Sequence, residues 1–174
     1  NSADADAAKA SFLNQECTAW TGDMSAMVAQ KYGMEQGGAD FDMAIMSELM
    51  SKEPLAAATR DNDDDWNDVV TWVWYGMLTA EELGIDSSNY GAANLSNPSL
   101  NRLLNSTLGL GTEANPLAAT WMQSVLATSG NYYEAYDRSF CDGDGAMSNC
   151  LIDRAGTQNA PHWAGGLQYA PPMR

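Results

Sequence analysis

Residues 66–78 carry apolar side chains on nearly every face of the helix that their spacing predicts. The acidic run of residues 61–65 comes just before them. Carboxylates at a helix N-terminus accept hydrogen bonds from free N–H groups and oppose the positive end of the helix dipole. Gly84 is suited to end this helix, because glycine readily adopts the left-handed conformation found just after a helix. A helix that is apolar all round must be covered, either within its own domain or by a partner.

The other patterns predict a chain of class α/β that is rich in helix. Two segments have the β-forming or alternating residues typical of strands: 17–21 and 41–46. Four more segments carry helix signals: 24–32 (ending at Gly33), 98–105, 116 to about 130, and 132–140. Two of these helices are predicted to begin at an Asn-Pro pair, at Asn97 and at Asn115, since proline suits the first helical position. From Ala155 onward the chain predicts loop.

With 174 residues and 45% hydrophobic side chains, the chain is long enough for one domain with a core.

The charge balance excludes one class of partner. Acidic residues number 23 against 8 basic ones, and nucleic-acid binders have the opposite balance. Anionic membrane surfaces are disfavoured for the same reason. We expect the acidity to serve solubility.

The residue types needed for catalysis or metal binding are scarce. His162 is the only histidine, and no Gly-x-Ser-x-Gly nucleophile motif or Cys/His zinc spacing is present. The run 61–65 opens like a calcium-binding EF-hand loop, but Trp72 stands where the bidentate Glu belongs. Asp142 and Asp144 leave open a weak, exposed calcium site. We therefore expect a protein that is not an enzyme and needs neither a metal nor a cofactor.

Three cysteines leave at least one unpaired within the chain. Cys141 and Cys150 bracket a loop rich in Gly and Asp, whose flexibility allows the two thiols to meet. The spacing predicts a Cys141–Cys150 disulfide in an oxidising compartment, with Cys17 left over.

Four motifs resemble a known family, the periplasmic solute-binding proteins of ABC transporters for general or polar amino acids. They are residues 50–55 (Met-Ser-Lys-Glu-Pro-Leu), 80–85 (Ala-Glu-Glu-Leu-Gly-Ile), 131–137 (Asn-Tyr-Tyr-Glu-Ala-Tyr-Asp) and 166–174 (Gly-Leu-Gln-Tyr-Ala-Pro-Pro-Met-Arg). The resemblance extends from about Ala10 to Arg174 and is to the C-terminal half of those proteins only. It implies the C-terminal portion of a two-lobed periplasmic-binding-protein (type II) fold. Residues 1–48 would be a remnant of the ligand-binding lobe 2, and 49–174 the C-terminal part of lobe 1 with a helical extension.

Asp23 is the main candidate for ligand binding. It follows a predicted strand and precedes a predicted helix, at the edge where α/β sheets bind ligands. Its charge suits the α-ammonium of an amino acid, while its position equally suits the N-cap of the helix. The stretch 21–25 is similar to the family segment that supplies the ammonium-binding Asp, although it departs from that pattern at Gly22 and Met24. Lys52 and Glu53 are weaker candidates beside the crossover between the lobes.

The resemblance implies an extracytoplasmic amino-acid-binding component of an ABC transporter, periplasmic or extracellular. Binding would close two lobes around an L-amino acid without chemistry or cofactor, and deliver it to an ABC permease. The ligand's carboxylate would be held by the missing N-terminal half, and the partner of Cys17 would lie upstream of Asn1. The alternative is a truncated remnant that acts as a structural or oligomerising interaction subunit and binds no amino acid, because half of a two-lobed receptor exposes apolar surface.

Overall fold

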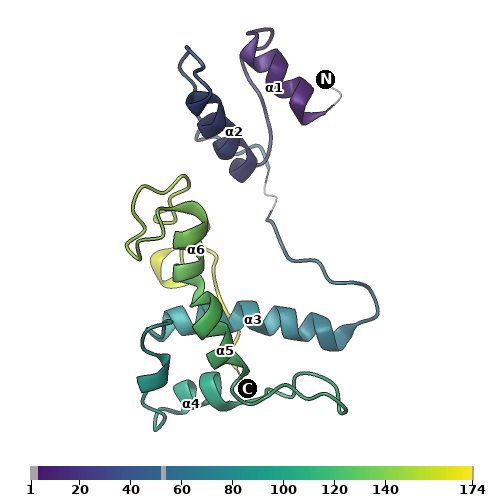
Figure 1. The fold of residues 1–174 in the computed structure, drawn as a ribbon, viewed down its shortest axis with the longest axis vertical. Helices are drawn as coiled ribbons and strands as arrows, with labels where there is room; N and C mark the ends of the chain where they lie inside the picture. Colours follow the sequence, from purple (N-terminus) through teal and green to yellow (C-terminus); the bar gives the residue numbers. More distant parts are fainter. Residues whose placement is uncertain (1–3, 52–53, 174) are drawn as a thin grey trace. The chain divides into compact units, whose positions relative to one another are not determined.

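The computed structural model describes residues 4–51 and 54–173. The chain divides into two compact units, Asn1–Leu55 and Ala56–Arg174 (Figure 1). Within the described ranges, no helix combines the length and the apolar character needed to cross a membrane. The candidates Lys52 and Glu53 lie outside the described residues.

The first unit consists of two helices, α1 (Ala5–Leu13) and α2 (Met24–Gln36), and of the segments that follow them. Asp4 caps α1 by accepting a hydrogen bond from the Ala7 N–H. Phe12 on α1 contacts two aromatic rings, Trp20 at 6.3 Å and Phe41 at 5.7 Å between centroids. Met34 is the only buried hydrophobic residue among the described residues of this unit, so its core is small.

The second unit is built around the long helix α3 (Asp64–Glu82). Helix α3 packs against α4 (Pro98–Asn105), α5 (Trp121–Ser129) and α6 (Tyr132–Phe140) (Figure 1). The second unit also contains two short 3-10 helices, η1 (Tyr90–Ala92) and η2 (His162–Ala164). The largest fully buried side chains of the main core come from α4 and α5: Leu103, Leu104, Met122 and Leu126. A second cluster joins Leu78 of α3 to Tyr132 and Tyr136 of α6 and to Ala170 near the C-terminus.

The helix signals near α3, α4 and α6 are confirmed. Helix α4 occupies 98–105 with Asn97 as its cap, and α6 occupies 132–140 with a capping box between Asn131 and Glu134. Gly84 follows α3 with a φ of 67°, as expected for a residue that ends a helix. Helix α2 is longer than predicted, because it continues through Gly33 to Gln36.

Both predicted strands are wrong. Residues 17–21 and 41–46 are irregular, and the described part of the chain contains no strand, only isolated bridges between Gly111 and Pro116 and between Pro161 and Gln168. A strand exists only where a second strand pairs with it, so β-forming residues alone cannot make one.

The predicted start of a helix at Asn115-Pro116 is also wrong. Pro116 pairs with Gly111, the Leu117 N–H donates to the Leu110 carbonyl at 2.9 Å, and the helix begins only at Trp121. Residues 111–116 form a tight turn, so the backbone at Pro116 cannot also begin a helix.

The apolar helix α3 is covered along only part of its length. Leu78 and Ala80 in its C-terminal half are 5% and 0% exposed. Trp66 and Trp74 remain 55% and 45% exposed. Within the described residues, the neighbours of α3 therefore bury Gly76, Leu78 and Ala80 near its C-terminus and leave apolar surface at Trp66 and Trp74.

Candidate functional site

Asp23 is the N-cap of α2 in the first unit. Its Oδ1 accepts hydrogen bonds from the Ser25 N–H at 3.2 Å and the Ser25 hydroxyl at 3.0 Å, and its Oδ2 accepts from the Ala26 N–H at 3.0 Å. The residue lies in the extended conformation that N-caps adopt, with φ −64° and ψ 144°. Asp23 is therefore an N-cap, which was one of the two roles predicted for it. Residues 17–21, predicted to form a strand before it, are irregular.

The same hydrogen bonds keep Asp23 charged. The Ala26 N–H has the largest effect and lowers the pKa of its carboxyl; burial opposes this with the next largest effect, and the Ser25 hydroxyl and N–H help to hold the pKa below the ordinary value of 3.8. A carboxylate offers about four acceptor positions, and three donors from Ser25 and Ala26 occupy this one. Asp23 is thus an ionised group on a fixed backbone, with acceptor capacity left for a further donor.

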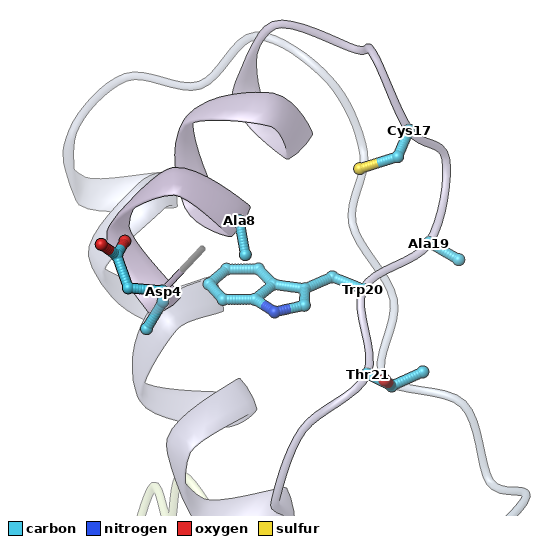
Figure 2. A pocket seen from close by; sticks show the side chains of 7 residues that line it. Asp4, Ala8, Cys17, Ala19, Trp20 and Thr21 are labelled. Atoms are coloured by element: carbon cyan, nitrogen blue, oxygen red, sulfur yellow. The ribbon is translucent and has the colours of Figure 1, made fainter. Parts of the chain in front are cut away.

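A hollow of about 470 Å³ lies in the first unit beside the segment that leads to Asp23. Figure 2 shows the Trp20 indole reaching from this segment toward Ala8 on α1. Cys17 and Thr21 line the same hollow, and Asp4 brings the only carboxylate among its lining residues. Asp23 is not one of the lining residues, so the structure does not combine the hollow and Asp23 into one site.

The carboxylates of the acidic loop are used within the loop. The Asp142 carboxylate accepts from the Asn149 side-chain amide at 2.6 Å, and Asp144 accepts from the Ala146 N–H at 2.9 Å. That N–H is the main cause of the lowered pKa of Asp144. Among the described residues, no group of three or more His, Cys, Asp or Glu side chains is placed to hold a metal ion.

Asp137 has a role in this loop that the sequence patterns did not reveal. Its side chain is 2% exposed and accepts from the N–H groups of Gly145 at 2.8 Å and Met147 at 3.0 Å. The only signal for it was its place in the motif 131–137, just before the first cysteine of the loop. Asp137 and the disulfide together fix the loop on α6.

The cysteine pairing is confirmed. Cys141 and Cys150 form a disulfide, and Cys17 is a free, half-buried thiol. His162 packs edge-on against Trp163 and Tyr169, with centroids 5.1 and 5.2 Å apart, so its surroundings are aromatic.

Comparisons with known proteins extend over nearly the whole chain. No family model matches it. It is 35% identical over 161 residues to the general L-amino acid-binding periplasmic protein AapJ of Rhizobium johnstonii, spanning 91% of this chain and 44% of that protein. It is 32% identical over 165 residues to the glutamate/glutamine/aspartate/asparagine-binding protein BztA of Rhodobacter capsulatus, spanning 94% of this chain and 46% of that protein.

One solved structure has a similar backbone fold. It is an ABC transporter periplasmic binding protein from Brucella ovis with glutathione bound, 32% identical, with a TM-score of 0.79 over 95% of this chain and 50% of that one. This likeness confirms the expected partial type II fold, whose helices are present here. The chain spans about half the length of the relatives it matches. Over more than nine tenths of its own length, the chain is similar to the C-terminal half of the periplasmic amino-acid-binding proteins of ABC transporters.

Proposed function

We propose that this chain forms the C-terminal half of an extracytoplasmic receptor that binds an L-amino acid and delivers it to an ABC permease. The observation that carries this proposal is the pair of relatives at 35% and 32% identity, both named as amino-acid-binding proteins. The Cys141–Cys150 disulfide fits a periplasmic location, because such bonds persist in oxidising compartments.

In this proposal Asp23 supplies the negative charge that meets the α-ammonium of the ligand. Support comes from its ionised state and its unused acceptor capacity. Because α2 and the cap fix the carboxylate, the ligand would find it already oriented. The ligand's carboxylate would be held by the half of the receptor outside this chain.

Residues 1–48 would then belong to the ligand-binding lobe 2 and 49–174 to lobe 1, with Lys52 and Glu53 close to the crossover between them. Closure of the two lobes would enclose the ligand without covalent chemistry, so no cofactor is needed. Because the Brucella ovis protein has glutathione bound, glutathione should be tried as a ligand together with L-amino acids. Its γ-glutamyl end presents an α-ammonium and an α-carboxylate, as a free amino acid does.

The test is calorimetry on a chimera in which this chain replaces the matched segment of AapJ. A panel of L-amino acids and glutathione should include a ligand that binds and is recovered unchanged. Asp23→Ser keeps a capping oxygen but removes the charge, and we expect it to weaken binding by about tenfold to a hundredfold.

Asp63→Ser is the matched control. Asp63 caps α3 by accepting from the Trp66 N–H, so it shares the capping role in the second unit, where it also pairs with Arg60. Its substitution should leave the affinity unchanged. A folded chimera that binds nothing in the panel would contradict the proposed function, and full affinity in Asp23→Ser would remove Asp23 from the site.

A further inference from the structure

We propose that three side chains on α3, which we call the α3 stripe, form the docking surface for the half of the two-lobed fold that this chain does not contain. The stripe consists of Trp66, Val70 and Trp74. They stand at successive intervals of four residues, so they follow one face of the helix from its first turn to just past its middle.

The stripe is apolar surface that the rest of the second unit leaves uncovered. Trp66 and Trp74 are 55% and 45% exposed, and Val70 is half-buried. Trp66 and Val70 belong to neither of the two core clusters. Trp74 touches Tyr132 on one side, with ring centroids 4.8 Å apart, and keeps the rest of its indole exposed.

The arrangement differs from the scattered exposed hydrophobic residues found on any protein surface. Two tryptophans and a valine share one face of a regular helix, which holds them at fixed spacing. Tryptophan contributes strongly to interfaces, since it buries a large area and loses little side-chain freedom. A contiguous apolar surface of this kind indicates a binding partner.

The fold match identifies the partner. The backbone of this chain follows that of the Brucella ovis protein over 95% of its length, yet it accounts for only 50% of that protein. The described residues contain no strand, although the expected fold is of class α/β. The proposal places the sheet in the other half, because an apolar helix face is covered by packing on such a layer.

Charge argues against a second copy of the chain as the occupant. Asp64, Asp65 and Asp68 are exposed on the same stretch of α3, on faces other than that of the stripe. A symmetric dimer through the stripe would bring together two chains that each carry a net charge of −15.

The test uses the whole chain and, as probe, the N-terminal fragment of AapJ that lies outside the match, with no amino acid added. Light scattering should find one chain per fragment. Trp66→Asp combined with Val70→Asp should weaken the association by about tenfold or more. Both positions are outside the cores, so circular dichroism should report unchanged helix content.

Trp163→Asp is the matched control, because Trp163 is 54% exposed and lies on η2 rather than on the stripe. It should bind the fragment like the unsubstituted chain. The proposal is overturned if the fragment does not bind, if the stripe and control variants bind equally, or if the chain forms a dimer that the stripe variant abolishes. Because no ligand is present, the result is independent of whether the receptor binds amino acids.

Discussion

Arg154 and Glu81 lie 73 positions apart in the sequence and form a two-pronged ion pair inside the second unit. Nη1 of Arg154 is 2.6 Å from Oε1 of Glu81, and Nη2 is 3.0 Å from Oε2. The two side chains are 6% and 11% exposed. The guanidinium also lies 4.7 Å from the centroid of the Tyr132 ring, and its Nε donates to the Asn159 carbonyl at 2.7 Å. Arg154 therefore ties the C-terminal loop to both α3 and α6.

We predict that Arg154→Met lowers the free energy of unfolding by about 3–5 kcal/mol, because Glu81 is left buried without its cation. The double variant Arg154→Met with Glu81→Leu should recover much of this loss, since a well-packed apolar pair can replace a buried ion pair. Urea unfolding followed by circular dichroism measures both. A double variant no more stable than the single one would assign the loss to the contacts of Arg154 with Asn159 and Tyr132.

A second prediction concerns the close approach of α3 to α5. A Cβ added at Gly76 would lie 2.5 Å from the sulfur of Met122, which is itself fully buried. Gly76→Ala should lower the free energy of unfolding by about 1–3 kcal/mol through overpacking, and so outweigh the better helix propensity of alanine.

Gly33→Ala is its matched control, because Gly33 lies inside α2 and a Cβ there meets nothing within 4 Å. This substitution should stabilise α2, by up to about 1 kcal/mol. Thermal melts of the two variants should move in opposite directions, and a stabilised Gly76→Ala would show that Met122 has room to move.

The two Asn-Pro pairs show how much of this fold could be predicted from the local sequence. At Asn97 the pair starts a helix, because the Asn97 side chain accepts from the Ser99 N–H and nothing competes for the backbone. At Asn115 the same pair lies in a turn, because the chain doubles back to pair Pro116 with Gly111. The two outcomes differ through partners elsewhere in the chain, which the local signal does not contain.

The candidate site was predictable to a similar extent. The position of Asp23 before a helix follows from its neighbours, and so do its hydrogen bonds to Ser25 and Ala26. The strands expected around it depended on pairing partners that the described residues do not supply. No local sequence pattern predicted the Glu81–Arg154 ion pair, because the neighbours of each residue are typical of an ordinary charged residue at the surface.

A third prediction is a pH dependence in α2. The pKa of Asp23 is below its ordinary value of 3.8 in the folded chain, chiefly because of the Ala26 N–H. Its stabilisation of α2 is therefore complete above pH 3.8 and is lost as the pH falls through the lowered value. Helix content in Asp23→Ser, which has no charge to lose, should fall less than that of the unsubstituted chain on acidification below pH 3.8. Equal acid sensitivity in the two proteins would assign the effect to other carboxylates.

The last prediction concerns the Cys141–Cys150 disulfide, which closes a loop across a sequence separation of 9. The loop has few apolar side chains to bury, so its order depends on the disulfide, on the two N–H groups that donate to Asp137 and on the hydrogen bonds within the loop. On the chain-entropy account, reducing the bond lowers the free energy of unfolding by about 2–3 kcal/mol. Thiol labelling of the denatured, unreduced chain should modify Cys17 alone, and Cys17→Ser should abolish the labelling. Three modified cysteines in the unreduced chain would contradict both the disulfide and the oxidising compartment that it implies.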